Sequence, residues 1–159
     1  LAKQYGADPG KAYTAALFHD MYKGISQETL AALVDRYGLE EKYKGNLNLA
    51  HSKLAAAVME REYGITDREL LDAVSFHTTG RAGMSLLEKI LYIADATEPG
   101  RDYPGEEELR MLARRDIDKA CLAACEHTLQ YLESLHKAID EDSTEARDDF
   151  KKGELYESK

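Results

Sequence analysis

Long hydrophobic runs, cysteine and positive charge are all scarce in this 159-residue sequence. No apolar run approaches the roughly 18 to 20 residues that span a bilayer, and no segment resembles a cleavable signal peptide. We therefore expect a cytoplasmic protein with no membrane partner. The formal net charge is -9 and basic residues are interspersed with acidic ones, which argues against a nucleic-acid partner. An anionic ligand would have to be held by local positive charge.

The two cysteines, Cys121 and Cys125, lie four residues apart in a strongly helical stretch. We interpret them as reduced, apolar residues on one helical face. A zinc site would need further Cys or His partners at familiar spacings, and His127 alone does not supply them. His127 and His136 are expected on a solvated face of the same helix. The cysteines therefore do not indicate a function.

Helix start and stop signals run almost from end to end, and no segment alternates as a strand does, which predicts an all-α fold. Asp8-Pro9 and Ser26 are typical N-terminal signals, and Gly38 and Gly64 are typical helix ends. No repeat, linker or low-complexity tract divides the chain. Residues 1–159 are therefore predicted to form a single-domain helical bundle. The opening residues resemble the last turn of a helix, and we expect that helix to begin upstream of Leu1.

Two further helix starts have the capping-box pattern, in which a hydroxyl and a carboxylate satisfy each other's backbone donors. They begin at Thr66 and at Ser85, each followed three residues later by Glu. Pro99 and Pro104 bracket a loop, after which further helices extend to about residue 139. The charged tail from Asp140 is expected to be a loop followed by a short final helix.

An acidic residue lies beside an apolar helical stripe in the segment that Ser85 caps. The stripe contains Leu87, Ile90, Leu91 and Ala94, and Asp95 falls along its edge. A carboxylate next to a core needs a partner, because burying an unpaired charge is costly. Asp95 therefore needs a cation, which is either a metal ion or an Arg or Lys side chain from another helix.

Three histidines lie where predicted helices begin or end. His19 ends an apolar run and is followed directly by Asp20, His51 lies near the start of a helix, and His77 closes another. Each is by itself most simply an ordinary polar histidine. Together with Asp95 they fall on four predicted helices and could converge on a bundle interior, which is where metal sites of helical bundles are built.

The turn after His77 carries donors that suit phosphate. Thr78, Thr79, Gly80 and Arg81 offer two hydroxyls, a flexible backbone and a guanidinium ahead of the next helix. A solvated turn is the equally simple alternative. Lys23 and Arg101 could add positive charge to the same predicted phosphate site.

These segments together resemble one family. The segments ALFHDMYK, NLAHSKLAAAV, SFHTTGRAGMSLLEKILYIADATEPGRDYPG and DIDKA are similar in order and content to the HD-domain superfamily. Within it they most closely resemble the bacterial symmetrical bis(5'-nucleosyl)-tetraphosphatases of the YqeK type. The resemblance covers nearly the whole chain. It implies a metal-dependent hydrolase that cleaves diadenosine tetraphosphate to two ADP, with iron as the usual metal.

The resemblance also implies roles for single residues. His19, Asp20 and Asp95 would be metal ligands, His51 and His77 would hold a second metal if one binds, and Asp20 and Lys23 would act in catalysis. The nucleotide and its phosphates would meet the residues that follow: Lys23, His51, His77, Thr78, Thr79, Gly80, Arg81, Arg101, Ala138, Ile139, Asp140, Glu141, Asp142 and Ser143. The tail matches the family only loosely.

One departure from the family leaves alternatives open. The family has a further metal-binding His in its first helix, which by alignment would fall upstream of Leu1. Imidazole and carboxylate ligands suit Mn, Co or Zn as well as Fe. A nucleotidase or other phosphohydrolase acting on mononucleotides would use the same ligands. A nucleotide-binding module without turnover and a homodimer are also compatible with the sequence.

Overall fold

The computed structural model describes residues 1–157, with side chains described for residues 1–154, and these residues form helices and turns without a strand. The elements run in the order α1 (Ala2–Tyr5), α2 (Pro9–Phe18), α3 (Gln27–Tyr37), the 3-10 turn η1 (Glu41–Tyr43), α4 (Leu47–Arg61), α5 (Arg68–Phe76), α6 (Leu86–Ala96), α7 (Glu106–Ala113), α8 (Ile117–Ser134) and α9 (Glu141–Glu157). The all-α prediction is confirmed. Among the described residues, no helix is long and apolar enough to cross a bilayer.

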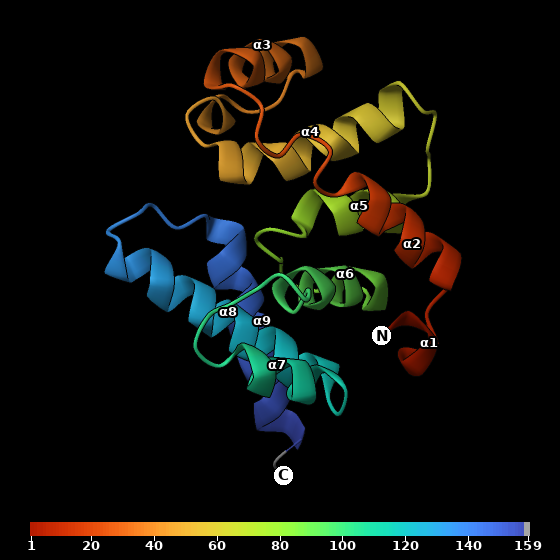
Figure 1. Ribbon diagram of the computed structural model, residues 1–159, viewed down its shortest axis with the longest axis vertical. Coiled ribbons are helices and arrows are strands. Elements are labelled where there is room, and N and C mark those ends of the chain that lie inside the picture. The colour runs from red at the N-terminus through yellow and green to blue at the C-terminus, as the bar shows by residue number, and fades with distance from the viewer. Residues whose placement is uncertain (158–159) are drawn as a thin grey trace.

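The helices are stacked along the long axis of the molecule (Figure 1). Helix α3 packs on α4, α4 on α5, and α5 on α6, while α2 lies against both α5 and α6. Helix α6 then packs on α8, which also contacts α7 and α9. The C-terminal end of α2, the start of α4, the end of α5 and the end of α6 carry the predicted site residues, so this stacking decides whether those residues meet.

Several predicted helix ends are confirmed. The Asp8 carboxylate accepts from the backbone N–H of Gly10 and Lys11, and Pro9 is the first residue of α2. Ser26 caps α3, which ends at Gly38 in the left-handed conformation. Ser85 and Glu88 form the complete capping box at the start of α6. Each of these signals acts over only three or four residues, and local sequence is therefore enough to predict it.

Three boundaries differ from the prediction. Helix α5 is capped by Asp67 and not by Thr66, because the Asp67 carboxylate accepts from Leu70 N–H and is also 2.8 Å from Lys11 Nζ on α2. Helix α4 ends at Arg61, before Gly64. Helix α8 ends at Ser134, well before residue 139, and His136 beyond it has a left-handed φ of 51°.

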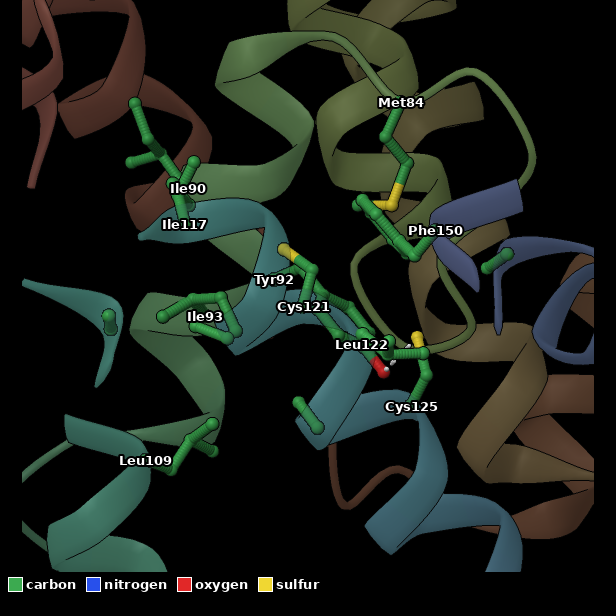
Figure 2. Close-up of a cluster of buried hydrophobic side chains, with 14 residues drawn as sticks. Met84, Ile90, Tyr92, Ile93, Leu109, Ile117, Cys121, Leu122, Cys125 and Phe150 are labelled. Carbon is green, nitrogen blue, oxygen red and sulfur yellow. Dashed lines mark hydrogen bonds between the residues drawn. The ribbon is translucent and has the colours of Figure 1, made fainter. Parts of the chain in front are cut away.

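Three clusters of buried side chains make up the core. One joins α3 to α4, a second lies among α2, α4, α5 and α6, and the largest lies among α6, α7, α8 and α9. Figure 2 shows the largest cluster, in which Ile90 of α6 lies beside Ile117 of α8 and Tyr92 of α6 lies next to Cys121 and Cys125 of α8, with its hydroxyl 3.4 Å from Cys125 Sγ. Both cysteines are buried and free, as predicted. Ala94, in contrast, is exposed and does not belong to the apolar stripe of α6.

The tail from residue 140 onward forms a long helix, so the prediction of a loop followed by a short helix is wrong. Helix α9 packs along α8 and buries Ala146 and Phe150, which lie one turn apart on its inner face. The segment is strongly charged, and local composition therefore gave little sign of a packed helix. Burial of these two apolar side chains against α8 is a tertiary effect that stabilises α9.

Candidate metal centre and nucleotide site

The His19-Asp20 pair lies at the C-terminal end of α2, directly against the start of α4 and the end of α5. His19 is the C-cap residue of α2, and its N–H still donates to Ala15 O. The two oxygens of the Asp20 carboxylate face different partners. Oδ2 is 2.6 Å from Lys23 Nζ and 3.5 Å from His19 Nε2, whereas Oδ1 is 3.3 Å from His51 Nε2 and 3.8 Å from His77 Nε2.

The three histidines are oriented in the same way by the backbone. Nδ1 of His19 contacts Ala16 O at 2.7 Å, Nδ1 of His77 contacts Val74 O at 2.7 Å, and Nδ1 of His51 contacts Leu47 O at 3.2 Å. A carbonyl oxygen can only accept, so each Nδ1 carries a proton. In a neutral ring the other nitrogen, Nε2, then has a free lone pair, and this is the tautomer that binds metal ions.

The atoms that meet at the centre of the site are acceptors. His51 Nε2 and His77 Nε2 are 3.1 Å apart, which is closer than two lone pairs tolerate without a shared cation or proton. Asp20 Oδ1 points at both and is buried without a hydrogen-bond partner among the described residues. His51 and His77 are themselves buried. A divalent metal ion would supply the missing positive charge, and the donor set fits one.

The predicted metal ligands lie close together in the structure. His19, Asp20 and His77 offer ligand atoms that all lie within 4.8 Å of one another. Asp95 lies at the edge of this group, with Oδ1 3.8 Å from His19 Nε2. The geometry thus brings both His77 and Asp95 close to the His19-Asp20 pair, and which of them bind a metal stays a prediction.

Asp95 has the positively charged partner that its position called for. Arg101 donates to Asp95 Oδ1 at 2.7 Å and to the Asp95 carbonyl at 3.0 Å. The Asp95 side chain is mostly buried, and burial alone would raise its pKa. The His19 contact and the Arg101 charge outweigh burial and lower the pKa of Asp95 to about 2. This carboxylate is therefore ionised at neutral pH.

The neighbouring titratable groups are shifted by the same two effects. Burial would raise the pKa of Asp20, but His77, Lys23 and the charge of His19 hold it well below its usual range. Burial and the nearby His77 lower the pKa of His51, which keeps its ring neutral. Burial also acts to lower the pKa of His19, but Asp95 and the other partners outweigh it and the pKa is raised. The site thus combines ionised carboxylates with a neutral His51, which is the state that a metal requires.

The turn after His77 divides into two parts. Thr78 Oγ1 lies 3.4 Å from His77 Nε2 and therefore faces the site. Thr79 is buried, and its hydroxyl donates to Gly80 O. Arg81 contacts the carboxylate of Glu88 at 2.6 and 3.0 Å and that of Asp72 at 3.1 Å. The guanidinium that the sequence predicted for phosphate binding is thus held by two carboxylates of the protein.

Gly80 is fixed by both backbone conformation and packing. Its φ is +68°, and a Cβ there would lie 3.1 Å from Ala146 Cβ on α9. We expect Gly80→Ala to lower the free energy of unfolding by about 2 kcal/mol, measured by urea denaturation. Gly83→Ala is the matched control, because Gly83 has φ +70° but no atom near its Cβ position. Equal losses in the two variants would show that the contact with α9 contributes nothing.

The segment Ala138–Ser143 connects α8 to α9. Ala138 and Glu141 are exposed, Ile139 is half-buried, and Ser143 is buried. Asp140 and Asp142 are paired with lysines on the neighbouring elements, at 3.4 Å from Lys42 Nζ and from Lys53 Nζ respectively. The contacts of this segment are therefore with η1 and α4.

Two residues next to the site escaped sequence analysis. Glu88 was explained by its place in the capping box, and its second role as the buried partner of Arg81 had no separate sequence signal. Lys53 follows His51 by two residues in an apolar helix, and a lysine inside the run LAHSKLAAAV was the available hint that its charge is buried. Its side chain is indeed largely buried, and burial lowers the pKa of its amine.

Comparison with known proteins agrees with this geometry. Residues 1–100 match the HD domain family. The chain is 39% identical over 137 residues to the symmetrical bis(5'-nucleosyl)-tetraphosphatase of Bacillus subtilis, which covers 83% of this chain and 72% of that protein. The protein of the same name from Staphylococcus aureus is 36% identical over 135 residues, covering 83% of this chain and 70% of its own length.

A solved structure shares the fold. The crystal structure of a protein from Clostridium acetobutylicum, described as a predicted HD superfamily hydrolase involved in NAD metabolism, superposes with a TM-score of 0.86 at 36% sequence identity. The match covers 94% of this chain and 80% of that one. This chain therefore belongs to the HD-domain family and, within it, to the group of the symmetrical bis(5'-nucleosyl)-tetraphosphatases.

Proposed function

We propose that this protein hydrolyses diadenosine tetraphosphate between its two middle phosphates, consuming one water and releasing two ADP. The observation that carries the proposal is the convergence of Asp20 Oδ1, His51 Nε2 and His77 Nε2, in which the buried Asp20 Oδ1 has no hydrogen-bond partner among the described residues. Relatives of this protein in Bacillus subtilis and Staphylococcus aureus are named for this activity. The substrate is strongly anionic and the chain has a net charge of -9, so the site itself must reverse the local field.

The acceptor atoms of the site define what would hold the metal. We assign His19, Asp20 and His77 as its central ligands, with Asp95 and His51 at the edges of the same group. When bound, a divalent cation neutralises phosphate charge and lowers the pKa of a coordinated water towards neutrality. Iron is our proposal for the metal because the family resemblance implies it. Mn, Co and Zn suit the same ligands.

Positive side chains beside the acceptors would receive the phosphates. Lys23 Nζ is 2.6 Å from Asp20 Oδ2 and more than half exposed, so it can reach a phosphate oxygen while staying near the carboxylate. Arg101 is oriented by Asp95 and remains partly exposed. We propose that both neutralise charge that grows on the departing ADP, which favours the transition state over the ground state. Asp20 would orient the attacking water.

Contacts to the nucleoside portion follow the family resemblance. Thr78 lies beside His77, and the segment Ala138–Ser143 is proposed to lie against the nucleotide. Thr79, Gly80 and Arg81 make contacts within the protein, and a role for them in nucleotide binding stays a prediction. Assembly as a homodimer, location in the cytoplasm and the absence of a nucleic-acid partner also stay predictions.

Product analysis tests the proposed reaction. The chain is incubated with diadenosine tetraphosphate and Fe²⁺, Mn²⁺, Co²⁺ or Zn²⁺ in water enriched in ¹⁸O, and the products are separated by anion exchange and weighed by mass spectrometry. We expect ADP as the sole product. One of the two ADP molecules from each cleavage should carry a single ¹⁸O atom, so half of the ADP is labelled. AMP with ATP, or no turnover with any of the four metals, overturns the proposal. Faster cleavage of a mononucleotide would identify a nucleotidase instead.

Removal of divalent metal is expected to stop turnover and to lower thermal stability. A ligand at about 100 times its Kd stabilises the folded state by about 2.7 kcal/mol, and this contribution disappears when a chelator removes it. The melting temperature is measured by circular dichroism with metal, with chelator, and after metal is restored. An unchanged melting temperature with full activity in chelator would contradict a metal held by His19, Asp20 and His77.

A further inference from the structure

The connection between α8 and α9 is held in place by two ion pairs. Asp140 Oδ1 accepts from Asp142 N–H at 3.1 Å and so caps the start of α9, while its Oδ2 lies 3.4 Å from Lys42 Nζ. The Asp140 side chain is only 6% exposed. Two residues later, in the first turn of α9, the Asp142 carboxylate is 3.4 Å from Lys53 Nζ. The segment Ala138–Ser143 is therefore fixed to η1 and to α4 by charged groups.

Lys53 is the more deeply placed of the two lysines. Its side chain is 11% exposed, compared with 46% for Lys42. The Lys53 Nζ lies 3.5 Å from the centroid of the Phe76 ring, so the ammonium is stabilised by the π face as well as by Asp142. A lysine is rarely buried to this extent unless its charge is paired, and here both partners come from other elements.

The position of Lys53 links this segment to the metal site. Lys53 follows His51 by two residues on α4, and Phe76 directly precedes His77 at the end of α5. The Lys53 side chain thus contacts both Phe76, the neighbour of His77, and Asp142 at the start of α9. Lys53 itself lies on α4, the helix that carries His51.

We infer that Lys53 is a positioning residue for nucleotide binding, which fixes Asp142 of the segment Ala138–Ser143 to α4 and to Phe76, the residue before His77. The inference rests on the proposed function, in which this segment meets the nucleotide. A segment that is already ordered in the free protein loses little conformational entropy when the substrate binds, and the affinity for the substrate is therefore higher. In the proposed function the reacting phosphates are held by the metal, Lys23 and Arg101, so we expect the tether to affect the affinity for the nucleotide more than the chemical step.

Steady-state kinetics with diadenosine tetraphosphate and metal test the inference. We expect Lys53→Met to raise KM about tenfold and to change kcat by less than about twofold. Lys53→Arg keeps the charge, and Lys53 borders a cavity of about 490 Å³ that leaves room for the longer side chain, so its KM should stay close to that of the unaltered chain. Asp142→Asn breaks the same pair from the other side and should raise KM as well.

Lys89→Met is the matched control. Lys89 is also partly buried, pairs with Asp118 at 2.6 Å and lies 5.6 Å from the centroid of the Phe150 ring, but it joins α6 to α8 and α9. It should leave both kinetic constants unchanged. A KM for Lys53→Met equal to that of the unaltered chain, or a loss confined to kcat, overturns the inference.

A measurement without substrate separates this inference from the proposed function. Hydrogen exchange followed by mass spectrometry should show faster exchange across residues 138–143 in Lys53→Met than in Lys89→Met. If the unaltered chain does not cleave the dinucleotide, the proposed function fails, and the exchange result still decides whether Lys53 holds the segment. If the unaltered chain is active and exchange in Lys53→Met is unchanged, the tether is wrong. Should Lys53→Met not fold, faster exchange across residues 138–143 in Asp142→Asn, which breaks the same ion pair, supplies the comparison.

Discussion

Replacing Asp20 with Asn is expected to lower kcat for diadenosine tetraphosphate by at least about 10³-fold, because several kcal/mol of transition-state stabilisation depend on the metal. Both carboxylate oxygens are in use, Oδ1 towards His51 and His77 and Oδ2 towards His19 and Lys23. An amide has the same shape but no charge, and one of its two positions becomes a donor. The variant should therefore also lose bound metal, measured by mass spectrometry of the metal content.

Asp35→Asn serves as the control for this substitution. Asp35 pairs with Lys44 at 2.6 Å, the same distance that separates Asp20 from Lys23, but it lies on the surface of α3. Its replacement should leave activity and metal content unchanged. Retention of metal with kcat within about tenfold would contradict the assigned ligand.

Replacing Arg81 with Met is expected to destabilise the fold by about 3 kcal/mol and to leave KM unchanged. Glu88 is 1% exposed, and Arg81 is its cationic partner at 2.6 Å. Without the guanidinium, a carboxylate remains charged in the core, and among the described residues the Ser85 N–H is its one remaining donor, which makes the loss of Arg81 costly. The free energy of unfolding is measured by urea denaturation, and KM at a temperature where the variant is folded.

A second substitution distinguishes a structural Arg81 from a nucleotide contact. Glu88→Gln removes the buried charge and keeps a residue suited to the third position of a capping box. The double variant Arg81→Met with Glu88→Gln should recover more than half of the lost stability, because no unpaired charge remains. If Arg81→Met instead raises KM about tenfold without loss of stability, Arg81 binds phosphate, as the sequence pattern indicated.

The helix starts at Asp8, Ser26 and Ser85 could be predicted because capping is local. A side chain satisfies backbone donors two or three residues away, and no distant part of the chain takes part. The start of α5 shows where this fails. Thr66 fits the capping pattern, but Asp67 caps the helix, and Asp67 also pairs with Lys11 of α2, which is distant in sequence.

Helix α9 shows the same limit at a larger scale. Its composition is polar and charged, and its helical state depends on the burial of Ala146 and Phe150 against α8. Ala146 also packs where a side chain at position 80 would fall, so α9 closes the turn that follows His77. Neither contact has a local signal, because the partners are more than 20 residues away along the chain.

The sequence alone determined the all-α class, most helix starts and the residue types of a metal and phosphate site, since these follow from patterns of a few residues and from an ordered series of motifs. Only the tertiary structure decided which acceptors meet. It placed His77 beside His19 and Asp20, and it paired Asp95 with Arg101 and Arg81 with Glu88. The physical reason is that partner choice depends on how helices pack, and packing is set by side chains that are far apart in the sequence.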